Sequence, residues 1–130
     1  MYHYVLPPRV EKKNALSDWA TPVVPVLKPD GTVRICGDFK HTINLYLHVP
    51  EYPIMPTPEE LFTKLNGGEL FTMLDLSHAY QQVVLDQKCQ PYVTTNTHLS
   101  LYRYTRLPFG MAAALAIFLQ IIDKMLDGLT

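Results

Sequence analysis

The stretch that decides the fold is LFTMLDLSHAYQQVVL, residues Leu70–Leu85, because it places one carboxylate inside an otherwise apolar run. The carboxylate belongs to Asp75, and the apolar residues on both sides of it are typical of a β-strand. Burying a charged carboxylate costs on the order of several kcal/mol unless it is paired or bound to a cation. The sequence therefore predicts a buried strand whose Asp75 carboxylate needs a charged partner or a bound cation, a break at SHAY, and a second strand over QQVVL.

The residues before this stretch predict a β-hairpin. TPVVPVLK and VRICGDF are extended runs rich in β-branched residues. The turn PDGT, Pro29–Thr32, separates them, and Gly31 is free to adopt a positive φ there.

A capped helix follows in TPEELFTKLNGG, residues 57–68. Thr57 is a capping residue, Pro58 suits the first helical position, and Glu60 completes the pattern of a capping box. We expect the buried face of this helix to consist of Leu61, Phe62 and Leu65.

The residues after Leu85 predict two more strands and a longer helix. YVTTNT and LYRYTR alternate and are expected to pair around His98–Ser100. In MAAALAIFLQIIDKMLDGL, residues 111–129, polar and apolar residues fall on opposite sides of a helix that ends near Gly128. The order of elements predicts an α+β fold with a small antiparallel sheet and two main helices.

The bulk properties exclude several classes of protein. A net charge of −1 over 130 residues argues against a free-standing polybasic nucleic-acid binder. No apolar run has the length of a membrane span and no signal peptide is evident, which predicts an intracellular protein without membrane contact. Cys36 and Cys89 are expected to be free thiols, and the histidines lack metal-ligand spacing.

Residues 1–16 are expected to form a loose arm, followed by one domain over residues 17–130.

Four segments in a fixed order resemble a known family. They are SDWATPVVPVLKPDGTVRICGDFK, YPIMPTPEELFTKLNGGELFTMLDLSHAYQQVVLD, YVTTNTHLSLYRYTRLPFG and AIF. Together they look like the reverse transcriptase of Ty3/gypsy retrotransposons, an RNA-directed DNA polymerase. The resemblance implies a right-hand polymerase fold, of which this chain would form the fingers and the first part of the palm.

The resemblance also implies part of a metal site. Asp75 matches the family's first metal-binding, catalytic aspartate, and the backbone carbonyl of Leu76 matches the second contact to Mg²⁺. Polymerases hold two such ions with several carboxylates. The family's other aspartates lie in a Tyr-x-Asp-Asp hairpin, and these 130 residues contain no such motif. We therefore expect a truncated polymerase domain with weak or absent Mg²⁺ binding and no activity alone.

Residues of the nucleotide pocket are implied in the same way. Arg34 matches a fingers arginine that contacts the incoming triphosphate, and Lys28 lies near the matching lysine. Tyr80 matches the residue that packs under the deoxyribose, and Phe109 matches a position beside the nucleotide. Each residue has a structural alternative, namely an exposed hairpin cation for Arg34, a core tyrosine for Tyr80 and a turn anchor for Phe109. His78 is interpreted as a solvated turn residue.

The segment after LPFG departs from the family pattern. Ala113, Leu115 and Leu119 stand where the family often has serine, proline and glutamine. The glutamine approaches the template strand in the family, so its replacement removes a polar contact to nucleic acid. The changes favour relaxed selection on catalysis.

Three interpretations of function stay open at this point. The first is a truncated polymerase domain, whose family partners are an RNA or DNA primer–template and deoxynucleoside triphosphates. The second is a non-catalytic module that binds nucleic acid or protein, and the third is a relic without function. An open edge of the palm sheet predicts self-association in each case.

Overall fold

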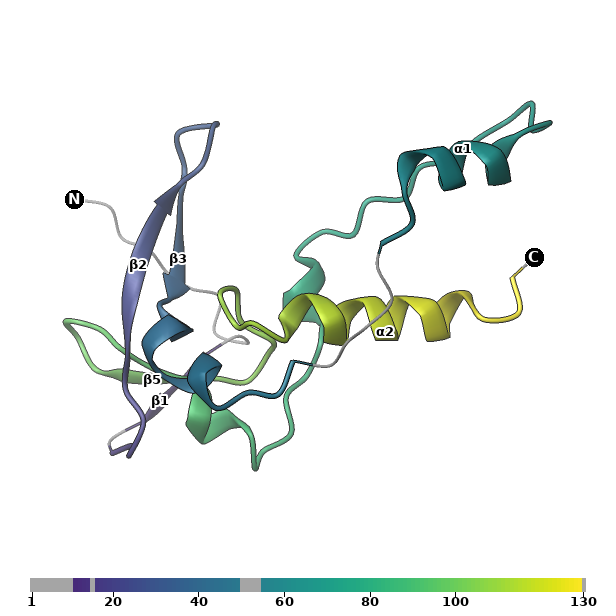
Figure 1. Ribbon diagram of the computed structural model, residues 1–130. Coiled ribbons are helices and arrows are strands. Elements are labelled where there is room, and N and C mark those ends of the chain that lie inside the picture. The colour runs from purple at the N-terminus through teal and green to yellow at the C-terminus, as the bar shows by residue number, and fades with distance from the viewer. Residues whose placement is uncertain (1–10, 15, 50–54, 130) are drawn as a thin grey trace.

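A computed structural model describes residues 11–14, 16–49 and 55–129 of the chain. Its strands gather at one end of the molecule, and its α-helices extend away from them (Figure 1). The strands are β1 (Glu11–Asn14), β2 (Thr21–Leu27), β3 (Val33–Gly37), β4 (Thr94–Asn96) and β5 (Leu101–Tyr104). The helices are α1 (Pro58–Leu65) and α2 (Ala114–Leu126), with short 3₁₀ turns η1 (Phe39–His41), η2 (Ile43–Leu45), η3 (Ala79–Gln82) and η4 (Gln90–Val93). The predicted α+β class is confirmed.

The five strands form one sheet in the order β1-β5-β4-β2-β3. The predicted hairpin β2–β3 and the predicted pair β4–β5 are both present and antiparallel. The expectation of a purely antiparallel sheet is wrong in one pairing, because β2 and β4 run parallel with Thr21 opposite Thr95. The sheet is therefore mixed, and this short parallel pairing joins the hairpin to the rest of the sheet.

The expectation of a loose N-terminal arm is wrong for Glu11–Asn14. These residues form β1, which pairs antiparallel with β5 in a register that places Glu11 opposite Tyr104. EKKN forms a strand although it has no apolar alternation, because an edge strand needs only backbone pairing on one side. Residues 1–10 and 15 of the expected arm lie outside the described residues, and the domain division at residue 16 stays a prediction.

The predicted turn PDGT connects β2 and β3, and hydrogen bonds of its own residues stabilise it. The Lys28 N–H donates to the Thr32 carbonyl at 2.8 Å, and Gly31 has a φ of 82°. The Asp30 carboxylate accepts from the Thr32 hydroxyl at 2.6 Å and from the Thr32 N–H at 2.9 Å. Both hydrogen bonds hold the pKa of Asp30 below its usual value, and the bond from the Thr32 hydroxyl has the larger effect.

The core is small and lies where η1, η2 and η4 meet β5. It contains Phe39, Ile43, Val93 and Tyr104, with the Phe39 and Tyr104 rings edge-on at 6.3 Å between centroids. Leu107 is also fully buried. This core fixes the 3₁₀ turns against the sheet, whereas α1 buries no residue and α2 buries only Ala114.

The prediction that Leu70–Leu85 forms two strands is wrong. Residues 70–76 form neither a helix nor a strand, and within residues 77–85 only Val84 forms an isolated bridge, with Arg106. Asp75 is exposed rather than buried, and Leu70 keeps 95% of its surface in solvent. A strand requires hydrogen bonds from a neighbouring strand, and apolar residues alone do not supply them.

The capping of α1 is confirmed, whereas its predicted burial is wrong. The Glu60 N–H donates to the Thr57 hydroxyl at 3.3 Å, and the Thr57 N–H donates to the Glu60 carboxylate at 3.0 Å. The side chains expected to be buried are instead exposed, Phe62 by 72%. The helix is stabilised by its own caps, because no described element covers its apolar face.

Helix α2 confirms the predicted C-terminal helix, and Gly128 follows its end with a φ of 83°. Phe118, Ile121 and Ile122 are half-buried, while Met125 is exposed. The helix contacts η3, which places its first turns beside Tyr80. Neither this helix nor any other in the described residues combines the length and apolarity needed to cross a membrane.

The turn after β5 packs directly against the end of β3. Gly110 has a φ of 90°, and a Cβ atom added there would lie 2.6 Å from the carbonyl oxygen of Gly37. An added Cβ at Gly37 would lie 2.6 Å from the ring of Phe39. Both glycines therefore allow a close approach of backbone and ring that any side chain would prevent.

Thr57→Ala tests the capping box. We expect the helical content of residues 58–65 to fall, because the loss of such a cap costs about 1 kcal/mol of helix stability. The global unfolding temperature should stay unchanged, because α1 buries no side chain. Backbone chemical shifts measure the local effect, with Thr63→Ala on the same helix as the control. A large drop in unfolding temperature would contradict the exposed placement of α1.

Gly110→Ala tests the close backbone approach. We expect a destabilisation of about 2 kcal/mol or more, because the change adds both a strained φ and a steric clash. Gly128→Ala is the matched control, since its φ is also positive but an added Cβ meets nothing within 4 Å. Urea unfolding midpoints compare the two variants, and equal effects would contradict the contact between Gly110 and Gly37.

Candidate functional site

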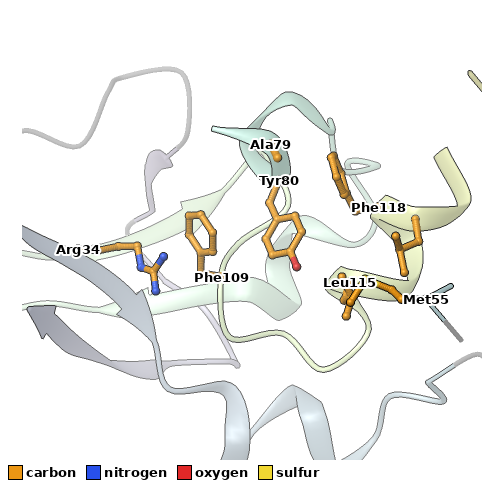
Figure 2. Close-up of a pocket in the computed structure, with 8 residues that line it drawn as sticks. Arg34, Met55, Ala79, Tyr80, Phe109, Leu115 and Phe118 are labelled. Carbon is orange, nitrogen blue, oxygen red and sulfur yellow. The ribbon is translucent and has the colours of Figure 1, made fainter. Parts of the chain in front are cut away.

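Two adjoining cavities lie between the hairpin, η3 and the start of α2. The first has a volume of about 560 Å³ and is mostly apolar. Figure 2 shows Phe109 between Arg34 and Tyr80, with Phe118 and Leu115 on the far side of Tyr80. The wall of this cavity is completed by Met55, Ala79 and Leu119.

The second cavity has a volume of about 470 Å³ and is more polar. Arg34 and Phe109 belong to both cavities, so the two spaces share a wall. Lys28 lines the second cavity because it lies two residues beyond Val26, the cross-strand partner of Arg34, and alternate residues of a hairpin share a face. Its other walls include Asp75, Leu76, Ser77, His78 and Gln81.

A row of aromatic rings holds the guanidinium of Arg34. The Arg34 Cζ atom lies 4.6 Å from the centroid of the Phe109 ring, which is within the range of a cation–π contact. The Phe109 and Tyr80 rings are tilted at 5.3 Å between centroids, and Tyr80 meets Phe118 edge-on at 5.5 Å. The rings fix the direction of the guanidinium without neutralising its charge.

A turn at Ser77–His78 connects the Asp75 segment to Tyr80. His78 has a φ of 52°, the only positive value at a non-glycine residue in the described part of the chain. The Gln82 side-chain amide donates to the Ser77 carbonyl at 2.7 Å, and the Gln81 N–H donates to the His78 carbonyl at 2.9 Å. His78 is exposed in a turn, as the sequence predicts, and it also lines the second cavity.

A complete Mg²⁺ site is not formed by these residues. Asp75 is the carboxylate on the second cavity, and it is exposed. Across residues 11–14, 16–49 and 55–129, no three histidine, cysteine, aspartate or glutamate side chains are grouped to hold a metal. Since Mg²⁺ is usually held by one or two carboxylates together with other oxygen ligands, the roles of Asp75 and Leu76 in metal binding stay predictions.

The structure brings together every predicted site residue. Arg34, Tyr80 and Phe109 line the first cavity, and Lys28, Asp75 and Leu76 line the second together with Arg34 and Phe109. These residues come from segments spread over more than half of the chain. Their convergence supports a shared site, although their individual roles stay predictions.

Sequence reasoning missed several walls of the site. The sequence places Phe118 among the apolar residues of the helix predicted over 111–129, yet in the structure its ring packs on Tyr80. Gln81 was assigned to a strand, yet it lies in η3 beside the second cavity. The only signal for Phe118 was its place in the AIF segment, and Gln81 carried no signal. Leu115 and Leu119, noted for their departure from the family pattern, line the first cavity.

Comparison with known proteins agrees with these observations. Residues 26–130 match the model of the reverse transcriptase (RNA-dependent DNA polymerase) family. The chain is 42% identical over 115 residues to the uncharacterized protein K02A2.6 of Caenorhabditis elegans, covering 86% of this chain and 9% of that protein. It is 32% identical over 107 residues to the transposon Tf2-3 polyprotein of Schizosaccharomyces pombe, covering 82% of this chain and 8% of the polyprotein.

Solved structures with the same fold include two complexes of a foamy viral protease-reverse transcriptase. The complex with double-stranded DNA superposes with a TM-score of 0.73 at 21% identity, covering 92% of this chain and 20% of the viral chain. The complex with an RNA/DNA hybrid has a TM-score of 0.69 at 21% identity, covering 92% of this chain and 16% of the viral chain. The match of the family model to most of the sequence and the agreement in fold establish that this chain belongs to the reverse transcriptase family.

Proposed function

We propose that this chain supplies the nucleotide-facing part of a reverse transcriptase, namely the fingers and the first part of the palm. The observation that carries the proposal is the meeting of Arg34, Tyr80 and Phe109 on one cavity, with Lys28 on the adjoining one. The chain spans only 8–9% of the length of the curated relatives it matches, so polymerase activity is proposed for the longer protein.

Arg34 and Lys28 are proposed to bind the triphosphate of an incoming nucleotide. A guanidinium presents its donors as a planar fork that suits phosphate oxygens, and an ammonium adds a second positive charge. Arg34 is exposed beside Phe109, so its donors are accessible from the cavity. The cavity lies between the two cations and Asp75, which favours an anionic ligand on the hairpin side.

The aromatic rings are proposed to contact the sugar and base of the nucleotide. Tyr80 and Phe109 offer adjacent ring faces, and Phe118 supports Tyr80 from behind. A ring in van der Waals contact with the sugar excludes a 2′-hydroxyl by bulk alone. Tyr80 is therefore proposed to favour deoxyribonucleotides over ribonucleotides.

Catalysis is assigned to a site that Asp75 shares with groups outside these 130 residues. Among the described residues, Asp75 is the single carboxylate on the second cavity, and phosphoryl transfer between nucleotides requires several. The remaining carboxylates are proposed to come from a longer polypeptide or a second chain. The fold's likeness to foamy viral reverse transcriptase solved with DNA and RNA/DNA hybrid supports a primer–template as the partner of that longer protein.

Self-association of the isolated chain is also part of the proposal. The segment 70–76 exposes Leu70, Met73 and Leu74 and pairs with no strand in the described residues. Exposed apolar edges promote pairing with a second chain. Binding measurements are therefore best made at low protein concentration.

Arg34→Gln tests the assignment of the triphosphate. We expect roughly 10- to 100-fold weaker binding of dTTP, because hydrogen bonds to a charged group contribute about 1.5–3 kcal/mol. Lys124→Gln removes a positive charge from the exposed part of α2, outside both cavities, and should leave binding unchanged. Titration of each protein with dTTP gives the dissociation constants, and equal losses in both variants would point to non-specific charge attraction.

Primer extension tests the assignment of catalysis. We expect no extension of a primer–template by the 130-residue chain in Mg²⁺, because one exposed carboxylate does not hold two ions. Asp75→Asn should be equally inactive and equally stable, since Asp75 is exposed and its charge is not desolvated. Extension by the unmodified chain that disappears in Asp75→Asn would contradict the proposal and reveal a second source of carboxylates.

A further inference from the structure

Asn44 joins η2 to the turn that carries Phe109. Its Nδ2 atom donates to the carbonyl oxygen of Gly110 at 2.9 Å, and its Oδ1 atom accepts from the N–H of Ala112 at 2.8 Å. The two partners lie 66 and 68 residues further along the chain. Both are backbone groups, so the contact specifies the path of the turn rather than any one of its side chains.

Only an asparagine fits this arrangement of partners. The amide presents a donor and an acceptor on one short side chain, and both are used here. The complementary partners fix which end of the amide faces Gly110. An aspartate of the same shape would place an oxygen against the Gly110 carbonyl, and an alanine would leave both backbone groups without this partner.

The turn held by Asn44 determines where the Phe109 ring lies. Phe109 directly precedes Gly110, whose backbone is already pressed against Gly37 at the end of β3. The ring is 4.6 Å from the Arg34 guanidinium and 5.3 Å from the Tyr80 ring. A shift of the turn away from β3 would therefore separate Phe109 from Arg34, which belongs to that same strand.

We propose that Asn44 is a positioning residue of the nucleotide cavity, which holds residues 108–112 so that the Phe109 ring stays between Arg34 and Tyr80. Asn44 lines neither cavity, so it acts through Phe109 rather than by touching a ligand. The consequence for nucleotide binding rests on the proposed function. The position of the Phe109 ring does not depend on the proposed function, and it is measured separately.

The first measurement follows the Arg34 side chain by NMR in the chain without ligand. In the unmodified protein, the ring current of Phe109 should shift the Arg34 side-chain resonances upfield. Asn44→Asp should return them toward their values in an unstructured chain. Asn66→Asp is the matched control, because it makes the same chemical change on the exposed residue that ends α1. Unshifted Arg34 resonances in a folded Asn44→Asp protein would overturn the inference.

Asn44→Ala provides a second variant, because it removes both hydrogen bonds without adding a charge. It should give the same Arg34 shifts as Asn44→Asp while the resonances of β4 and β5 stay in place. Unfolding of both variants would also overturn the inference, since Asn44 would then hold the whole core rather than one turn.

The second measurement is a double-mutant cycle on dTTP affinity. Asn44→Asp should weaken binding roughly tenfold in the unmodified chain and have no further effect in Phe109→Ala, because coupled residues are not additive. Equal losses in both backgrounds would show that Asn44 acts independently of Phe109 and would overturn the inference. If the unmodified chain binds no dTTP, the proposed function fails, and the Arg34 resonances alone decide the role of Asn44.

Discussion

The contact between the backbones of Gly37 and Gly110 is the constraint on which the rest of the site depends. It brings the end of β3 against the turn after β5, with the Phe39 ring of the core packed beside both glycines. Because Arg34 belongs to β3 and Phe109 directly precedes Gly110, the same contact places a cation over an aromatic face. A side chain at Gly110 would push the turn away from β3, and one at Gly37 would clash with the Phe39 ring, so the absence of both Cβ atoms shapes the site.

The contact that holds Arg34 leaves the charge of its guanidinium available. A ring face orients the guanidinium but leaves its charge available, whereas a carboxylate partner would orient and neutralise it together. Tyr80 and Phe118 continue the row of rings and stiffen it, because each ring packs on the next. Apolar contacts between rings thus order the first cavity, whereas polar groups of the hairpin and of the Asp75 segment line the second.

A large part of the apolar surface of this chain remains uncovered. Helix α1 shows an amphipathic pattern and a complete capping box, yet all of its apolar side chains are exposed. The segment 70–76 is mostly apolar and exposed, and it pairs with no strand in the described residues. The hydrophobic contribution to stability comes from area removed from water, so these segments contribute little to the stability of the chain in this form.

The sequence by itself determined the features that depend on neighbouring residues. Thr57 and Glu60 cap α1 through bonds within one turn, and Gly31 closes the hairpin through its own φ. The alternation in the sequence also predicted the pairing of β4 with β5, and the family motifs singled out Arg34, Tyr80 and Phe109, which line one cavity. Only the tertiary structure decided whether an apolar face is buried, as at Phe62, or whether an extended run joins a sheet, as at Asp75. It also decided the hydrogen bonds of Asn44, because partners more than 60 residues apart leave no local pattern in the sequence. Burial likewise requires a second surface, which one segment of sequence does not specify.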